Sequence, residues 1–332
     1  MPVYLEPLES AQLQSECPEG VLASVRFGAK PNPKESERWL SAAIPNRPLA
    51  RCPVEELWPA AGTVTRIPAL GAAAAADDRS LFVAIESPAG PDLSLDALTF
   101  DVYSGLFRAV ERAGYPHILR VWNYLPRIHG ASAGIDRYMR FCRGRSEAFA
   151  AHYGDTFSRQ LSAASAVGCP GDALIVHVLA SREPGRHIEN PRQVAAHRYP
   201  ERYGPKSPSF ARGTVTGEAW GRTVFVSGTA SIVGHESVFP GDPARQTEET
   251  MRNVEAVLDE AGVPGRGGPL GKRLGSLRVY VRFPEHQEVI RLALLASTGQ
   301  AVPTAWLQAE ICREELLVEI EAIGLARDRT SA

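Results

Sequence analysis

The chain has 332 residues, of which 44% are hydrophobic and 22% are charged, and its formal net charge is −2. These values are ordinary for a soluble globular protein and provide no general attraction to nucleic acid or to an anionic membrane. No apolar run approaches the roughly 20 residues of a membrane-spanning helix, and the first residues do not read as a secretory signal. We therefore expect a protein with no nucleic-acid partner and no membrane partner.

Five cysteines are scattered along the sequence, at Cys17, Cys52, Cys142, Cys169 and Cys312. They form no Cys-x-x-Cys pair, and the histidines form no His-x-x-x-His pair, so no metal site is predicted. An odd number of unclustered cysteines favours a reducing, cytoplasmic location.

The first 80 residues contain few periodic signals. Residues 21–27 alternate like a strand. Residues 31–59 are rich in proline and are expected to form loops, and the alanine run within residues 71–78 is expected to form a surface loop or a short helix.

Two similar series of elements follow. The first predicts a strand at 81–85, a helix at 92–114, a strand at 117–124, a helix at 134–153 and strands at 161–167 and 173–180. The second predicts a strand at 223–233, a helix at 246–261, a strand at 277–283, a helix at 285–297 and a β-hairpin at 304–323. Both series read β-α-β-α-β-β, so we predict an α+β fold made of two pseudo-repeated units.

Short segments of the two series also match. Residues 119–121 resemble residues 277–279, and residues 174–177 resemble residues 316–319. This alignment places His177 where the second unit has Glu319, so the two units are expected to differ chemically at that position.

The predicted hairpin has arms at 304–312 and 316–323, joined by a charged turn. In the second arm Leu317, Glu319 and Glu321 share one face, because side chains alternate along a strand. The opposite face is apolar and is expected to belong to the core. The two glutamates are either solvated or held in a cleft, and the hairpin alone leaves both interpretations open.

Residues 181–221 connect the two units and contain six arginines, five prolines, Tyr199 and Tyr203. Arginine and tyrosine side chains suit carboxylate ligands, whereas a flexible linker is usually rich in glycine and serine. We therefore interpret this segment as an active-site connection. The predicted boundaries are residues 1–180, 181–221 and 222–332.

Segments 224–230, 277–281 and 317–322 resemble the YjgF/Rid superfamily. The resemblance implies a chorismate-mutase-like fold for the second unit, with the first unit as a degenerate copy. Its members commonly form trimers with ligand clefts between subunits, and its imine deaminases carry an arginine just after a proline before the hairpin turn. Here Ala305 stands two residues after Pro303, and residues 303–306 contain no arginine, which argues against imine deamination.

Further segments resemble a narrower family, the chorismatases, at residues 189–194, 199–205, 207–212, 227–235 and 312–321. This resemblance implies an enzyme that removes pyruvate from chorismate with neither a metal nor an organic cofactor. The products of the family are a dihydroxycyclohexadiene carboxylate or hydroxybenzoates, notably 3-hydroxybenzoate.

Chorismate carries two carboxylates and an enol ether. Its carboxylates call for guanidinium and phenol partners. The candidate substrate-binding residues are Arg140, Arg143, Arg212, Tyr124 and Tyr203.

Cleavage of the enol ether requires an acid, and Glu319 is the predicted general acid. It lies in an apolar strand, where desolvation raises the pKa of a carboxyl and keeps it protonated near neutral pH. The wider family also places a functional glutamate there. Glu321, on the same face, is its rival for this role.

Ala230 and Cys312 are the predicted walls of the pocket. No neighbouring residue in the sequence would lower the pKa of Cys312, so we expect a pocket wall rather than a nucleophile. A cysteine at this place resembles the hydroxybenzoate-forming members, which favours 3-hydroxybenzoate over the dihydroxycyclohexadiene carboxylate.

Two further questions stay open in the sequence. A non-catalytic YjgF-like small-molecule binder is the alternative of another class. Because an internal repeat replaces contacts that single-unit relatives make with copies of themselves, a monomer and a homotrimer both fit.

Overall fold

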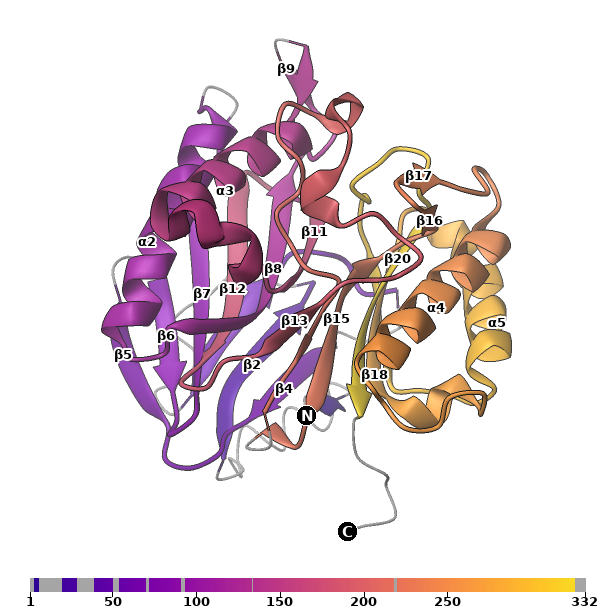
Figure 1. Ribbon diagram of the computed structural model, residues 1–332, viewed down its shortest axis with the longest axis horizontal. Coiled ribbons are helices and arrows are strands. Elements are labelled where there is room, and N and C mark those ends of the chain that lie inside the picture. Colours follow the sequence, from indigo (N-terminus) through magenta and orange to yellow (C-terminus); the bar gives the residue numbers. More distant parts are fainter. Residues whose placement is uncertain are drawn as a thin grey trace.

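The computed structural model describes residues 3–5, 20–28, 39–49, 54–69, 72–90, 93–132, 134–217 and 220–325. Two large sheets face each other, and each carries a pair of helices on its outer face (Figure 1). No helix within these ranges is long and apolar enough to span a membrane.

The first large sheet has the strand order β11-β8-β12-β7-β6-β5. Its strands are β5 (Thr65–Ala69), β6 (Ala72–Ala76), β7 (Ser80–Pro88), β8 (His117–Pro126), β11 (Ala163–Cys169) and β12 (Ala173–Ser181). Helices α2 (Leu95–Arg112) and α3 (Arg137–Tyr153) cover its outer face. Side chains from both layers form one apolar core, because each helix buries the stripe that faces the sheet.

The second large sheet has the strand order β13-β14-β15-β20-β18-β19. Its strands are β13 (Arg186–Ile188), β14 (Gly213–Val215), β15 (Thr223–Thr229), β18 (Leu274–Val281), β19 (Thr304–Gln308) and β20 (Val318–Leu325). Helices α4 (Pro243–Glu260) and α5 (Gln287–Thr298) cover its outer face and complete a second core.

The two sheets have the same strand order when one of them is read backwards. In the first unit β11 runs parallel to β8, and β12 lies antiparallel between β8 and β7. In the second unit β19 runs parallel to β18, and β20 lies antiparallel between β18 and β15. The predicted α+β fold with two repeated units is therefore confirmed.

The strand register supports the alignment of His177 with Glu319. His177 pairs with Trp122 of β8, and Glu319 pairs with Tyr280 of β18. Trp122 and Tyr280 occupy equivalent positions, because each lies two residues after the arginine of the matching segments 119–121 and 277–279.

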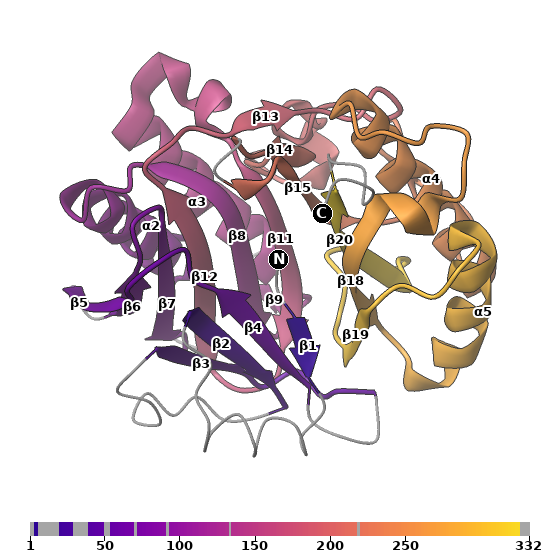
Figure 2. The same ribbon diagram turned by 90° about the horizontal axis from the view of Figure 1, so that it is seen from below.

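A third sheet, with the order β1-β4-β2-β3, packs against the inner faces of the two large sheets (Figure 2). Its strands are β1 (Val3–Leu5), β2 (Val21–Phe27), β3 (Leu40–Ile44) and β4 (Glu55–Pro59). A central core joins side chains of all three sheets, including Phe27, Trp122 and Tyr280. Polar side chains on the inner faces are thereby shielded from water.

The remaining elements are short. They are β9 (Ala131–Ser132), β10 (Ile135–Asp136), β16 (Ile232–Val233), β17 (Glu236–Ser237) and the 3₁₀ segments Gly154–Gln160, Ala196–Arg198, Glu201–Tyr203, Leu270–Arg273 and Pro284–His286.

Two predictions for the first 80 residues are wrong. The segment 31–59 was expected to form loops, but its described part contains β3 and β4. The alanine run was expected to be a loop or a short helix, but it forms β6, which pairs with β5 and β7. Alanine has no strong strand preference of its own, so the neighbouring strands decide the conformation.

The predicted hairpin at 304–323 is also wrong, although both of its strands exist. β19 and β20 do not pair with each other, because β18 lies between them. The side-chain alternation was nevertheless correct. Val318, Ile320 and Ala322 join the outer core, while Glu319 and Glu321 are buried on the inner face.

The segment 181–221 contains more regular structure than its sequence suggested. It supplies β13 and β14 to the edge of the second sheet, and the chain between them carries short 3₁₀ segments. The predicted boundaries at 180/181 and 221/222 remain predictions.

Candidate active site

A cavity of about 440 Å³ lies between the two repeated units. It is lined by the start of α3, the connection between the units, the end of β15 and the segment between β19 and β20. The lining residues used below are Tyr138, Tyr199, Tyr203, Phe210, Arg212, Gly228, Ala230, Cys312, Arg313 and Glu319. Its volume falls within the range of small-molecule sites.

A smaller inner cavity of about 40 Å³ shares part of this lining, including Gly228, Cys312 and Glu319. It extends toward α3 and β11, where Arg145 and Ser165 contribute to its wall. Glu319 thus lines both cavities.

Glu319 is 4% exposed, and its carboxyl makes no hydrogen bond or ion pair with any described residue. Burial raises its pKa to about 8, and the nearby charge of Glu321 adds to the rise, while Arg120 and Arg212 oppose it. The carboxyl is therefore mostly protonated at neutral pH. A protonated carboxyl in a cavity is a proton donor.

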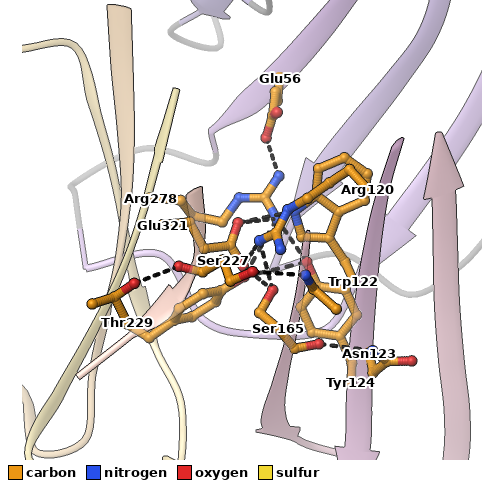
Figure 3. A network of polar contacts seen from close by, with 12 residues as sticks. Glu56, Arg120, Trp122, Asn123, Tyr124, Ser165, Ser227, Thr229, Arg278 and Glu321 are labelled. Atoms are coloured by element: carbon orange, nitrogen blue, oxygen red, sulfur yellow. Dashed lines mark hydrogen bonds and ion pairs between the residues drawn. The ribbon is translucent and has the colours of Figure 1, made fainter. Parts of the chain in front are cut away.

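Glu321 has a different environment from Glu319, although it lies on the same face of β20. Its carboxylate is bound by donors from three strands. Figure 3 shows four of these residues, which are Arg120, Trp122, Ser165 and Arg278, and the Tyr280 hydroxyl also donates to it. Burial alone would raise its pKa, but the two guanidiniums and the hydrogen bonds outweigh burial and lower it. Glu321 lines neither cavity described above, whereas Glu319 lines both.

Behind Glu321 the ion pairs continue to the third sheet. Arg278 of β18 pairs with Glu321 at 3.3 Å and also with Glu56 of β4. We call Glu56, Arg120, Arg278 and Glu321 the charged cluster. Its members are at most 6% exposed.

Arg212 is buried in the wall of the main cavity. It is 4% exposed, and its Nη2 donates to the Val194 carbonyl at 3.1 Å and to the Tyr199 hydroxyl at 2.7 Å. Its guanidinium also lies over the Phe210 ring. These contacts hold the guanidinium rigidly against the wall of the main cavity.

Tyr203 also lines the main cavity, next to an arginine that the sequence analysis treated only as part of a turn. The Arg313 guanidinium lies 4.0 Å from the centre of the Tyr203 ring and donates to the His235 carbonyl and the Ser237 hydroxyl, both at 3.0 Å. Arg313 is thus a second cation at the main cavity, and its place beside Cys312 was the available signal.

Arg140 and Arg143 do not line either cavity. Both form ion pairs with Asp96, near the start of α2, Arg140 at 3.9 Å. The cation that reaches the inner cavity from α3 is Arg145, which is 3% exposed. Its Nε and Nη2 have no hydrogen-bond partner among the described residues.

The helix period explains why Arg145 points inward. Tyr138, Cys142 and Arg145 are spaced by four and three residues, so they share one face of α3, and all three line the inner cavity. A single arginine on an apolar helix face was the signal in the sequence.

The other predicted residues divide into two groups. Ala230 and Cys312 line the main cavity, and burial raises the pKa of the Cys312 thiol to about 12, so it stays a thiol. Tyr124 lines neither the main nor the inner cavity. It is fully buried, and its hydroxyl accepts a hydrogen bond from Arg278 at 2.9 Å.

His177, the counterpart of Glu319, is enclosed by aromatic rings and lies outside both cavities. The rings of Phe82 and Tyr124 lie 5.8 and 6.0 Å from its own. Burial lowers its pKa to about 3, so it is neutral. The first unit therefore holds no acid at this position.

Known proteins resemble the chain along most of its length. The family model described as "Chorismatase FkbO/Hyg5-like, N-terminal" matches residues 56–180. A 3-hydroxybenzoate synthase of Streptomyces hygroscopicus is 38% identical over 230 residues, which are 67% of this chain and 67% of that protein. A chorismatase of Streptomyces rapamycinicus is 38% identical over 233 residues, covering 68% of this chain and 69% of that protein.

A solved structure extends the similarity to 98% of the chain. A crystal structure of a chorismatase has a TM-score of 0.85 and 30% identity, and the alignment covers 98% of both chains. The YjgF gene product of E. coli aligns with 42% of this chain and 98% of its own, at 19% identity and a TM-score of 0.31. The relatives named above and the full-length structural match agree with each other, and the chain belongs to the chorismatase family of enzymes.

Proposed function

We propose that the protein removes pyruvate from chorismate and that Glu319 is the general acid. The observation that carries this proposal is a carboxyl with a pKa of about 8 in a cavity that guanidinium groups also line. The protonated carboxyl donates to the terminal carbon of the enol ether, which makes the three-carbon arm a better leaving group. Water or the neighbouring ring hydroxyl then completes the displacement.

The arginines of the two cavities suit a substrate with two carboxylates. Arg212 and Arg313 line the main cavity, and Arg145 lines the inner one. Guanidinium groups bind carboxylates through paired, charge-assisted hydrogen bonds. We propose that one carboxylate binds Arg145 and that the other binds the Arg212 side of the main cavity, with the enol ether between them near Glu319.

The proposed aromatic product is 3-hydroxybenzoate. Chorismate and the pair of 3-hydroxybenzoate and pyruvate have the same atoms, so that reaction needs no added water. The dihydroxycyclohexadiene carboxylate needs one water per turnover. Cys312 and Ala230 line the main cavity together with Glu319, and a relative 38% identical to the chain is named for 3-hydroxybenzoate.

The test is incubation of the purified protein with chorismate and no added metal. Pyruvate is measured with a coupled lactate dehydrogenase assay, and the ring product is identified by chromatography and mass. We expect equal amounts of pyruvate and 3-hydroxybenzoate. A folded protein that releases no pyruvate contradicts the proposed function, and the diene as sole product contradicts only the choice of product.

The cytoplasmic location and the oligomeric state, monomer or homotrimer, remain predictions. Size-exclusion chromatography with light scattering measures the second.

A further inference from the structure

The inner layer between the sheets contains more carboxyls than the two guanidiniums of the charged cluster can pair. Among the described residues, Glu56, Glu319 and Glu321 are buried there. Arg120 and Arg278 form ion pairs with Glu56 and Glu321, and neither forms one with Glu319. A buried carboxyl without a cation keeps its proton.

Each of the two guanidiniums that bind Glu321 also has other contacts. Arg120 is 3.2 Å from Glu321 and donates to the Ser165 hydroxyl at 2.9 Å, while its Nη1 has no hydrogen-bond partner among the described residues. Arg278 is divided between Glu321 and Glu56. Glu321 is therefore bound by two guanidiniums. Arg278 also pairs with Glu56, and Arg120 has one N–H group without a hydrogen-bond partner among the described residues.

Glu56 comes from the third sheet, outside the repeated units. It is 1% exposed and lines neither the main nor the inner cavity. Its strand partner on β2 is Val25, and its side chain crosses to Arg278 of β18 (Figure 3). Burial raises the pKa of Glu56, and the Arg278 guanidinium opposes that rise. Because a guanidinium keeps its charge, the carboxylate of Glu56 offsets it.

We propose that Glu56 is a positioning residue for the acid. Because Glu56 pairs with Arg278, Arg278 does not neutralise Glu321 by itself, and Arg120 remains paired with Glu321. Without Glu56, Arg278 turns fully to Glu321, and Arg120 is released from Glu321 and turns to Glu319. A guanidinium beside Glu319 stabilises the carboxylate, and the acid is lost. This role rests on the proposed function of Glu319.

Other charged or titratable groups also face Glu319 and stay unchanged in the variants below. They are Arg212 of the connection, Tyr138 and Arg145 of α3, Cys312 of the preceding segment and Tyr280 of β18. The variants change the charged cluster only, so a shift in the titration of Glu319 reports on the cluster.

The first measurement is a ¹³C NMR titration of protein labelled at the glutamate carboxyls. The Glu319 signal is assigned by its absence from Glu319→Gln. We expect Glu56→Gln to lower the midpoint of this signal by about one pH unit or more, equivalent to about a tenfold change in the proton equilibrium. This readout does not depend on turnover, so it stands even if chorismate is not the substrate.

The second measurement is the pH profile of kcat/KM for pyruvate release. In Glu56→Gln the activity is expected to fall at a lower pH than in the unchanged protein, by the same interval as the NMR midpoint. Glu56→Asp keeps the charge and is expected to keep the profile. Glu55→Gln is the matched control, because Glu55 precedes Glu56 on β4 and forms an ion pair with Arg26, at 3.9 Å, outside the charged cluster.

A compensating variant separates this role from a structural one. Glu56→Gln leaves a buried guanidinium without its full partner, which is destabilising. The double variant E56Q/R278Q removes one charge of each sign, so we expect it to fold and its Glu319 midpoint to return toward the original value. A Glu319 midpoint that is unchanged in folded Glu56→Gln, or that is about one unit low in the double variant, overturns the proposal.

Discussion

Gly228 of β15 lies directly against the carboxyl of Glu319. A Cβ atom built on residue 228 would overlap Glu319 Oε1 and come within 2.9 Å of its Cδ and 2.8 Å of the Ser165 Cβ. Glycine is therefore required here by the close approach of the carboxyl, since the backbone of residue 228 is not in the left-handed region. The position of this carboxyl is fixed from two strands.

The first prediction is that Gly228→Ala displaces the Glu319 carboxyl. We expect kcat for pyruvate release to fall at least about 100-fold, because small displacements of a catalytic group have large effects on rate. The control is Gly105→Ala in α2, where an added Cβ meets no other atom within 4 Å and the activity should not change. Near-normal kcat in folded Gly228→Ala would contradict the assigned position.

The second prediction concerns pH. Because the pKa of Glu319 is about 8 and the protonated form is the acid, kcat/KM should fall about tenfold per pH unit above pH 8. The folded chain also holds this proton more tightly than the unfolded chain, where the pKa is near 4.5. The associated stability is therefore complete below about pH 4.5 and is lost as the pH rises through 8.

Glu319→Gln tests the stability part of this prediction. Glutamine resembles the protonated carboxyl and cannot ionise, so the variant should melt at a higher temperature than the unchanged protein at pH 9. The difference should shrink toward pH 5. Scanning calorimetry at the two pH values measures it, and equal melting temperatures at pH 9 would argue against a raised pKa.

The third prediction compares two arginines of α3. Arg145→Met removes the cation of the inner cavity, so KM for chorismate should rise by about 10- to 100-fold, the usual cost of a lost charge-assisted hydrogen bond. Arg143→Met is the matched control, because Arg143 pairs with Asp96 away from both cavities. Steady-state kinetics of both variants decide the assignment, and equal KM values would remove Arg145 from the site.

The fourth prediction is that Cys312 is a wall and not a nucleophile. Its thiol pKa of about 12 leaves almost no thiolate at neutral pH. Cys312→Ala should therefore retain pyruvate release within about tenfold and instead change the ratio of ring products, which chromatography measures. A loss of about a thousandfold or more in a folded variant would point to covalent catalysis.

The sequence predicted local features of this fold better than its strand pairing. Alternation along residues 316–323 correctly separated Glu319 and Glu321 from the core side, because alternation is a property of a single strand. It could not show that β18 inserts between β19 and β20, because pairing depends on the whole sheet. The alanine strand β6 was missed for the same reason.

The sequence predicted those cavity residues that lie within the segments resembling known families. Arg212, Tyr203, Ala230, Cys312 and Glu319 all line the main cavity. Arg140 and Arg143 were chosen as arginines of a stretch, residues 140–149, that resembles the chorismatases, without use of the helix period, which selects Arg145. The contribution of Glu56 could not be read from the sequence, because it arises from a long-range contact with Arg278, 222 residues away.

Rapid-mixing measurement of pyruvate release by Glu319→Gln, with chorismate in excess, is the most direct test of the central claim. With the fold checked by circular dichroism, we predict a first turnover at least about 1,000-fold slower than in the unchanged protein at pH 7, while bound chorismate is still detected. Release at an undiminished rate would show that the proton comes from another group.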